Sequence, residues 1–198
     1  MRSRKARIRR LYDFTSEFYD GLYGYEQEKK FTSIFNLLRN SKFNVMLDAG
    51  CGTGLITKKL QGKGNFIVGV DFSKGMLQRA KEKLGKVIKM DFVLGDIEYL
   101  PFRSKSFDLV LSITVLQNCN PLRALKSLLR VLSNSGVLVL SYLKRSKEVK
   151  EFEAKLKDYV LKDLDLIDNV VILSGQQAMN LVGKRSWKIE VKAHGIAH

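Results

Sequence analysis

Apolar residues near the start of the chain recur at intervals of three and four positions. This spacing predicts one face of a helix, made of Ile8, Leu11, Phe14, Phe18 and Leu22. A second helix is predicted over Glu26–Arg39, with its apolar stripe on one side, and Asn40, Ser41 and Lys42 break it. Residues 1–40 are therefore expected to form a helical segment in front of the rest of the chain.

From residue 45 onward, short apolar runs alternate with stretches of helical periodicity. The runs are rich in Val, Ile and Leu with little alternation, which is typical of parallel strands covered on both faces. This order predicts an α/β fold with a doubly wound sheet of seven strands, mostly parallel with an antiparallel last strand, and helices on both faces. The expected strands are Val45–Asp48, Ile67–Asp71, Asp91–Leu94, Phe107–Ser112, Val137–Tyr142, Val170–Leu173 and Trp187–Val191. The expected helices are Leu55–Leu60, Lys74–Leu84, Leu122–Leu132 and Lys147–Leu161.

Length and composition fit a single soluble domain. The chain has 198 residues, of which 45% are hydrophobic, enough to bury one sizeable core. The sequence contains neither a run of about eighteen apolar residues nor a signal-peptide pattern, so we expect a cytoplasmic protein with no membrane segment. The two cysteines, Cys51 and Cys119, lack the spacing of a disulfide framework or a zinc site. Neither a disulfide nor a bound metal is expected.

The charge balance is strongly basic. The 35 Lys and Arg residues outnumber the 20 Asp and Glu residues, for a formal net charge of +15. Such a field raises encounter rates with RNA or DNA and adds a salt-dependent binding term. A generally Lys-rich, solvated surface explains the net charge equally well, because net charge without a located patch argues only for solubility and non-specific binding. Six of the first ten residues are basic, namely Arg2, Arg4, Lys5, Arg7, Arg9 and Arg10.

A glycine-rich turn follows the first predicted strand. Asp48, Gly50, Gly52 and Gly54 form a D-x-G-x-G-x-G pattern that leads into a helix and has Cys51 inside it. Glycines let the backbone turn sharply and let a ligand approach without a Cβ in the way. A dinucleotide fingerprint would read G-x-G-x-x-G, whereas here the third glycine comes one residue early, which disfavours NAD. The loop is predicted to lie at the ligand crevice of the sheet; the alternative is a purely structural strand-to-helix turn.

Two carboxylates follow the next two strands. Asp71 lies 21 residues beyond Gly50 (71 − 50), the spacing at which a carboxylate accepts hydrogen bonds from both ribose hydroxyls. On its own, Asp71 could instead cap the following helix. Asp96 stands where a carboxylate could accept from an adenine amino group, or where it could simply be a turn residue. The glycine loop and Asp71 together favour a nucleoside cofactor.

These segments resemble the class I S-adenosylmethionine-dependent methyltransferases, and the resemblance runs from about Tyr12 to Tyr142. It implies S-adenosylmethionine as the cofactor and a Rossmann-like domain over residues 41–198, capped by the helices of residues 1–40. Within the site, the resemblance implies contacts with each part of the cofactor. The loop of Gly50, Cys51, Gly52 and Gly54 would flank the methionine part, and Asp48 would help to hold it. Asp71 would bind the ribose. Phe72 and Met76 would pack on the adenine, Asp96 would bind the adenine amino group, and the Ile97 backbone would face the ring.

The N-terminal helical segment also resembles part of the same family. Tyr12-Asp13 and Tyr19-Asp20 match the Y-D-x-x-A-x-x-Y-D cap of many small members, with Ser16 in place of Ala. The resemblance implies that Tyr19 is a wall of the site. The seven-residue spacing of the two tyrosines also fits core aromatics.

Acceptor residues in this family usually follow the fourth strand. In this chain the segment contains Gln117 and Asn118, which would orient an acceptor or else serve as ordinary loop caps. It contains no N-P-P-Y or D-P-P-Y motif, so the amino-nitrogen methylation associated with that motif is not supported. Cys119 lacks the Pro-Cys context of cytosine-C5 methylation.

Methyl transfer from a sulfonium is an in-line displacement, so positioning and the exclusion of water supply much of the catalysis. The two histidines, His194 and His198, stand at the end of the sequence, so no histidine base is expected. We expect RNA, above all tRNA, as the substrate, because the basic residues 1–10 precede the cap. The alternatives are a small-molecule or protein acceptor, and a non-catalytic cofactor-binding subunit. A small partner subunit for recognition or stability also fits a chain of this length.

Overall fold

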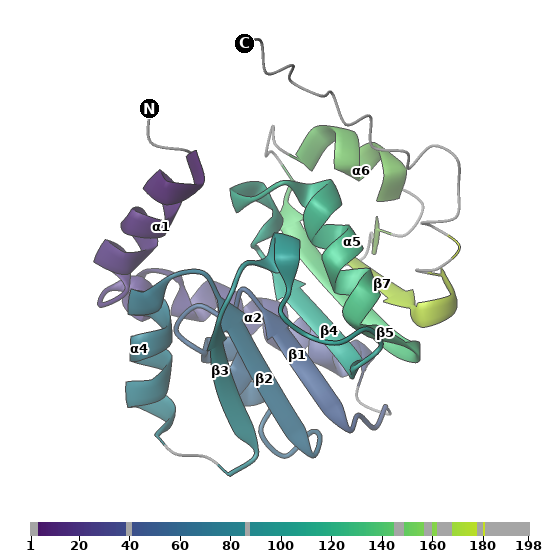
Figure 1. Cartoon of the computed structure of the whole chain (residues 1–198), viewed down its shortest axis with the longest axis horizontal. Coiled ribbons are helices and arrows are strands. Elements are labelled where there is room, and N and C mark those ends of the chain that lie inside the picture. Colours follow the sequence, from purple (N-terminus) through teal and green to yellow (C-terminus); the bar gives the residue numbers. More distant parts are fainter. Residues whose placement is uncertain are drawn as a thin grey trace, which may run out of the picture.

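The computed structural model describes residues 4–38, 41–85, 88–144, 149–156, 160–161, 168–177 and 180. In this part of the chain, seven strands form one sheet in the order β3-β2-β1-β4-β5-β7-β6, with helices on both faces (Figure 1). The strands are β1 (Val45–Ala49), β2 (Phe66–Asp71), β3 (Met90–Leu94), β4 (Phe107–Ile113), β5 (Leu132–Leu143), β6 (Val160–Leu161) and β7 (Asp168–Ser174). The helices are α1 (Arg4–Thr15), α2 (Tyr19–Leu37), α3 (Leu55–Lys59), α4 (Lys74–Leu84), α5 (Pro121–Val131) and α6 (Lys150–Leu156), with short 3₁₀ helices η1 (Ile97–Tyr99) and η2 (Leu116–Asn118).

The sheet is wound in both directions from its centre. Strands β1 to β5 pair in parallel, whereas β7 pairs antiparallel with β5 and β6. From β1 the chain proceeds outward to β2 and β3, then returns to β4 on the other side of β1. The strand order therefore reverses between β1 and β4, and the carboxyl ends of these strands form the ligand crevice of such a sheet. The predicted doubly wound, mostly parallel sheet is confirmed.

The C-terminal elements differ from the prediction in detail. The helix expected over Lys147–Leu161 is wrong in its extent, because α6 ends at Leu156 and Val160–Leu161 forms β6. Pairing with β6 satisfies backbone groups that would otherwise be unpaired along the outer edge of β7. The strand expected over Trp187–Val191 lies outside the described residues, so β6 is the seventh strand of the described sheet.

The apolar stripe over residues 8–22 does not belong to one helix. Helix α1 ends at Thr15 and α2 begins at Tyr19, and at the break the Ser16 hydroxyl donates to the Asp13 carbonyl at 3.0 Å. The opposite side of α1 faces the rest of the protein, which leaves most of the stripe in solvent. Its exposed members are Leu11 (58%), Phe14 (80%), Phe18 (63%) and Leu22 (67%).

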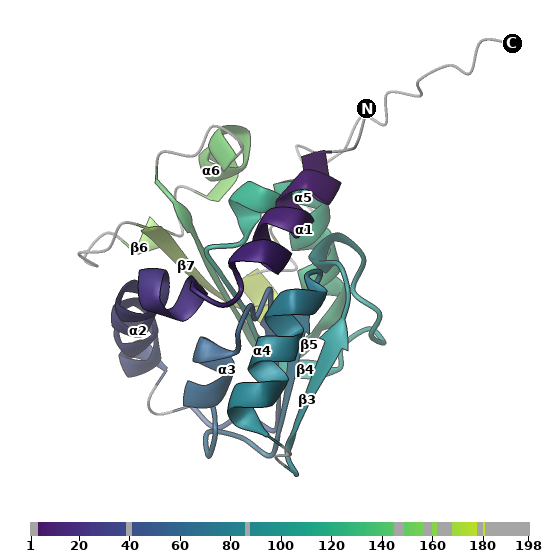
Figure 2. The same ribbon diagram turned by 90° about the vertical axis from the view of Figure 1, so that its left-hand side faces the viewer.

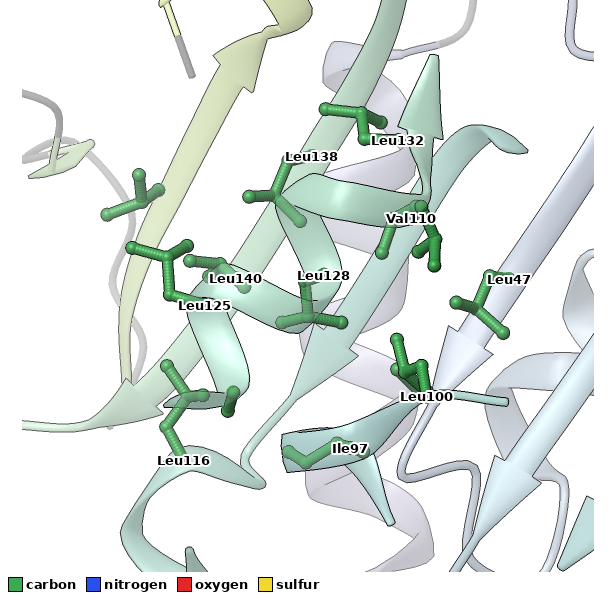
Figure 3. Packing of buried hydrophobic residues seen from close by; sticks show 14 of the residues in the cluster. Leu47, Ile97, Leu100, Val110, Leu116, Leu125, Leu128, Leu132, Leu138 and Leu140 are labelled. Carbon is green, nitrogen blue, oxygen red and sulfur yellow. The ribbon is translucent and has the colours of Figure 1, made fainter. Parts of the chain in front are cut away.

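Side chains of the central strands alternate between two packed layers. One layer lies between the sheet and α5, α6 and η1, and Figure 3 shows Leu125 and Leu128 of α5 packed over Leu138 and Leu140 of β5. The other layer lies beneath α2 and α3. Its buried residues include Ile34, Met46, Leu60, Leu109 and Leu111. The core thus holds the central strands between two sets of helices, and their carboxyl ends are left for the site.

Helix α1 lies beside α4 (Figure 2). The Asp13 carboxylate accepts hydrogen bonds from Ser73 Oγ at 2.6 Å and from Gly75 N at 3.0 Å. A Cβ on Gly75 would lie 2.9 Å from the Asp13 carbonyl oxygen, so the close approach of the two helices requires glycine. Since negative charge is favourable at a helix N-terminus, Asp13 attaches α1 to the start of α4.

Candidate functional site

A cavity of about 570 Å³ opens at the carboxyl ends of the central strands, beneath α1 and the start of α2. It brings together most of the residues predicted to bind the cofactor. A smaller cavity of about 340 Å³ adjoins it along the glycine loop and is lined by Asp48, Cys51, Thr53 and Gln27, among others. The larger cavity is lined by Lys5, Tyr12, Tyr19, Gly50, Gly52, Asp71, Phe72, Met76, Gly95, Asp96, Ile97, Ile113, Thr114, Val115, Asn118 and Cys119.

The glycine loop has the backbone conformation and close contacts that require glycine. Gly50 has a φ of +83° and Gly52 a φ of +54°, both in the left-handed region. A Cβ on Gly50 would lie 2.4 Å from Val115 Cγ2. The Gly50 and Cys51 N–H groups both donate to the Val70 carbonyl, at 2.7 and 3.0 Å. The loop is therefore fastened to β2 and folded tightly against the segment after β4.

Two residues of the glycine motif face the core. A Cβ on Gly54 would lie 3.1 Å from Leu84 Cδ1 and 3.2 Å from the Ala80 Cβ, so this position serves the packing of α3 on α4. The Cys51 side chain belongs to a buried cluster with Phe92. Burial raises the pKa of the Cys51 thiol well above its usual value, which keeps it protonated.

Asp71 is a nearly buried carboxylate at the carboxyl end of β2, with 7% of its surface exposed. Its Oδ2 accepts from Gly52 N at 2.9 Å, and its Oδ1 accepts from Ser73 N at 2.8 Å. Burial raises the pKa of Asp71 to about 6, although the backbone hydrogen bonds oppose this rise. Asp71 thus ties the glycine loop to the end of β2 and faces the cavity with a carboxylate able to accept further hydrogen bonds.

Asp48 is buried at the end of β1, where it accepts a 2.6 Å hydrogen bond from Thr57 Oγ1 on α3. Burial raises its pKa to about 6. It does not line the larger cavity but lines the smaller one, beside Gln27. Gln27 is a buried residue of α2 that the sequence analysis missed, because it lies far from any motif and only folding brings α2 against the glycine loop.

The predicted adenine-binding acid, Asp96, is already paired. Its Oδ1 accepts from Glu98 N at 3.0 Å, and its Oδ2 forms an ion pair with Lys5 Nζ. Lys5 Nζ also lies 2.7 Å from Glu98 Oε1, and Lys5 lines the cavity. By sequence, Lys5 was predicted only as one of the six basic residues among the first ten, with no place in the site. Ile97, the next residue, is 6% exposed and forms part of the same wall.

Of the two predicted acceptor residues, only Asn118 lines the larger cavity. Asn118 Nδ2 donates to Tyr12 Oη at 2.8 Å, which links the segment after β4 to α1. The Gln117 side chain turns back and donates from Nε2 to the Thr114 carbonyl at 2.6 Å. Cys119 also lines the cavity, and burial raises its pKa to about 12, so its thiol stays protonated at neutral pH.

The family model described as a methyltransferase domain matches residues 47–140. An uncharacterized protein of Methanocaldococcus jannaschii is 36% identical over 140 residues, which cover 69% of this chain and 52% of that protein. A malonyl-[acyl-carrier protein] O-methyltransferase of Buchnera aphidicola is 42% identical over 102 residues, which cover 50% of this chain and 40% of that enzyme. The chain spans about half the length of the relatives it matches. The matched segment holds the glycine loop, Asp71 and Asp96 at the cavity. The chain therefore contains a methyltransferase domain over residues 47–140.

Solved structures share the fold of this methyltransferase domain. The magnesium protoporphyrin IX methyltransferase of Synechocystis PCC 6803 with bound S-adenosylmethionine superposes with a TM-score of 0.69 at 19% identity, covering 87% of this chain and 97% of that chain. The complex of the Haloferax volcanii Trm112 methyltransferase activator with a methyltransferase matches with a TM-score of 0.57 at 23% identity, covering 72% of this chain and 66% of that chain.

No group of three or more His, Cys, Asp or Glu side chains in the described ranges is arranged to hold a metal ion. Among the helices that the structure describes, none combines the length and the apolar character needed to cross a membrane.

Proposed function

We propose that the protein transfers a methyl group from S-adenosylmethionine to RNA, with tRNA as the first candidate substrate. The observation that carries the proposal is a cavity, lined by most of the residues predicted to bind the cofactor, whose rim is formed by an arginine-rich helix. Helix α1 contributes Lys5 and Tyr12 to the cavity and carries Arg7, Arg9 and Arg10 on its exposed surface. In this proposal α1 and α2 act as the cap of the site.

The chemistry of the cavity residues fits S-adenosylmethionine. Gly50 and Gly52 form a cradle that a Cβ would fill or strain, and it would receive the methionine part. Asp71 would accept hydrogen bonds from the ribose hydroxyls, and Phe72 and Met76 would pack on the adenine. Asp48 and Gln27 lie at the smaller cavity, where they would help hold the polar end of the methionine. When bound, the cofactor supplies an electrophilic methyl group on a positively charged sulfur.

At the end of the cavity where the acceptor would bind, the residues would hold the nucleophile in place rather than deprotonate it. Asn118 would orient an acceptor while Tyr12 holds its amide group at 2.8 Å. Tyr19 lines both cavities and would close the site against water. Burial raises the pKa of Tyr19 well above its usual value, so its hydroxyl stays protonated at neutral pH and would donate rather than accept a proton. An acceptor nitrogen or oxygen that needs no strong base fits this arrangement.

Unpaired positive charge beside the cavity favours a polyanionic substrate. Arg7, Arg9 and Arg10 form no ion pair with the residues that the structure describes. Arg9 lines a groove next to Asp96. A second groove is lined by Arg123, Lys126 and Arg130, where Arg123 lies 3.9 Å from Glu98 Oε2 and Arg130 donates to the Leu100 and Phe102 carbonyls. Phosphates that bind to both basic groups would place an RNA strand across the mouth of the cavity.

A second candidate is a small-molecule or protein acceptor, such as an acyl group on a carrier protein. It is favoured by the similarity to a malonyl-[acyl-carrier protein] O-methyltransferase. A small partner subunit is also proposed, on the fold likeness to the methyltransferase that is bound to the Trm112 activator. A non-catalytic cofactor-binding subunit is the remaining alternative.

Two measurements test the proposal in sequence. Calorimetry with S-adenosylhomocysteine should show binding, and Asp71→Ala should weaken it by about 1.5 to 3 kcal/mol, the range for hydrogen bonds to a charged group. Asp91→Ala, which removes an exposed carboxylate from the neighbouring strand, is the matched control and should bind like the parent. Unchanged affinity in Asp71→Ala would refute the ribose assignment.

Methyl transfer is then measured with S-adenosylmethionine labelled in its methyl group. The acceptors are unmodified tRNA transcripts and, separately, a malonyl thioester of an acyl-carrier protein. Label in RNA alone supports the proposal, and label in the thioester alone supports the second candidate. Cofactor binding without label in either acceptor, with or without an added partner subunit, would reject the RNA proposal.

A further inference from the structure

A buried ion pair lies next to the cavity but outside it. Lys30 of α2 and Asp168 at the start of β7 both have fully buried side chains, and Lys30 Nζ lies 3.0 Å from Asp168 Oδ1. This oxygen makes no hydrogen bond with the described residues, so the contact is an ion pair rather than a directed hydrogen bond. Glu26, one helical turn before Lys30, also pairs with the amine. Removing charges from water is unfavourable, and a buried pair stabilises a fold less than apolar packing of the same volume. The pair therefore calls for a role other than holding α2 to the sheet.

Thr114 connects this pair to the site. Lys30 Nζ donates to Thr114 Oγ1 at 3.0 Å, and Thr114 Oγ1 donates to Asp168 Oδ2 at 2.7 Å. Ser141 Oγ of β5 donates to the same Asp168 oxygen at 2.7 Å. The Thr114 N–H in turn donates to the Ser141 carbonyl at 3.0 Å. Side chains from α2, β5 and β7 therefore converge on the first residue after β4.

The backbone at Thr114 is held in an unfavourable conformation. Its φ is +59°, in the left-handed region that β-branched residues rarely adopt. Among the described non-glycine residues, only Lys105 also has a positive φ, and Lys105 lies in an exposed turn. Strain of this kind persists where surrounding contacts over-determine the conformation. At Thr114 those contacts are the hydrogen bonds to Lys30, Asp168 and Ser141.

The conformation of Thr114 sets the direction of the segment that lines the cavity. Val115 follows directly, and its Cγ2 atom occupies the space into which a Cβ of Gly50 would project, at 2.4 Å. The Thr114 carbonyl accepts from Gln117 Nε2 at 2.6 Å, and Asn118 reaches Tyr12 at 2.8 Å. A change at Thr114 would therefore move Val115 away from the glycine loop and Asn118 away from the cap.

We propose that Lys30 and Asp168 are positioning residues of the methyltransferase site. Acting through Thr114, the pair holds residues 114–119 against the glycine loop and the cap, so that the donor and acceptor sides of the cavity keep a fixed geometry. The inference rests on the proposed function only where it assigns residues 114–119 to the acceptor side. The contact with the glycine loop is independent of the acceptor.

The test needs no acceptor, so its failure is distinct from failure of the RNA proposal. In Lys30→Met, binding of S-adenosylhomocysteine should weaken about tenfold by calorimetry. Hydrogen exchange at the Thr114 and Asn118 amides, which donate to the Ser141 and Val115 carbonyls, should accelerate at least tenfold in the same variant. Thr114→Ser keeps the hydroxyl and should behave like the parent, whereas Thr114→Val should resemble Lys30→Met.

Lys59→Met is the matched control, because it removes an exposed ion pair between α3 and Glu28 of the same helix α2. It should change neither cofactor affinity nor exchange at Thr114 and Asn118. If Lys30→Met fails to fold, Ser141→Ala and Thr114→Val, which remove one hydroxyl each, carry the same test. Folded variants with lower thermal stability but parental affinity and parental exchange at these amides would overturn the proposal and leave the pair a purely structural attachment.

Discussion

At the scale of single residues, Asp71 is a buried carboxylate at the cavity, in the position proposed to bind the cofactor ribose. Because burial raises its pKa to about 6, much of the carboxyl is protonated below that pH. Ribose hydroxyls donate best to the ionised form, so affinity for S-adenosylhomocysteine should be full above pH 7 and fall about tenfold by pH 5. Calorimetry across pH 5 to 8 measures this. The free energy of unfolding should depend on pH in the opposite direction from cofactor affinity. A carboxyl pKa that is raised in the folded state contributes stability at low pH, and this stability is lost as the pH rises through about 6.

Asp71→Asn is the control for this pH dependence, because it removes the titrating group while keeping an acceptor oxygen. It should bind more weakly than the parent at pH 8 and show a shallower decline toward pH 5. Some decline should remain, since Asp48 also has a pKa of about 6. A parent affinity that is the same at pH 5 and pH 8 would contradict the assignment.

A comparison of Gly50 with Gly62 distinguishes the effect of backbone strain on stability from the effect of a close contact. Gly50 and Gly62 both have positive φ, +83° and +77°, but only Gly50 faces another atom, Val115 Cγ2 at 2.4 Å from a built Cβ. Gly62→Ala should therefore lower the free energy of unfolding by about 1 kcal/mol from strain alone. Gly50→Ala should lower it by more than about 3 kcal/mol and abolish cofactor binding, since strain and overlap combine. Urea denaturation and calorimetry measure both. Equal losses in the two variants would contradict the contact between Gly50 and Val115.

At the scale of elements, Asp13 attaches α1, part of the proposed cap, to the start of α4. Asp13 accepts from Ser73 Oγ and Gly75 N, so Asp13→Ala should lower the free energy of unfolding by about 1 kcal/mol. It should also speed proteolysis within α1. The control is Glu17→Ala, which removes an exposed pair with Arg79 and should change stability by less than about 0.5 kcal/mol. Protection of α1 equal to that of the parent in Asp13→Ala would show that other contacts hold the cap.

At the scale of the whole molecule, the net charge of +15 makes RNA binding a salt-dependent quantity. The logarithm of affinity should fall linearly with the logarithm of salt concentration. Replacing Arg7, Arg9 and Arg10 with Ala should flatten that slope by about 2 to 3 units if each contacts one phosphate, while affinity for S-adenosylhomocysteine is unchanged. Fluorescence anisotropy with a tRNA transcript measures the slope.

The control for the charge itself replaces three exposed lysines on other helices, Lys29, Lys58 and Lys81. This variant has the same net charge as the arginine variant, so a general surface effect would flatten both slopes equally. If both slopes flatten equally, or if the parent does not bind RNA at low salt, the three arginines are only a solvated helix face and do not bind RNA specifically. The preference would then move to a small-molecule or protein acceptor.

Local patterns in the sequence were sufficient to predict the sheet, the glycine loop and the position of Asp71 at the end of the second strand. The apolar runs specify buried strands, and glycine spacing reports a backbone constraint that lies within a few residues. The N-terminal stripe was misread as one helix, because apolar spacing alone does not say which side of α1 faces the protein. Contacts of Tyr12 and Asp13 with Asn118 and Ser73 decide that orientation.

The sequence by itself determined the α/β class, the order of strands and helices up to β5, and the motif that indicates S-adenosylmethionine, since each depends on neighbours in the chain. Only the tertiary structure decided which polar side chains meet. The pairs Lys5–Asp96 and Lys30–Asp168 join residues far apart in sequence, and Gln27 reaches the site only because α2 packs beside α3. Such contacts follow from how helices pack on the sheet, and packing depends on the shape of the whole core rather than on any local pattern.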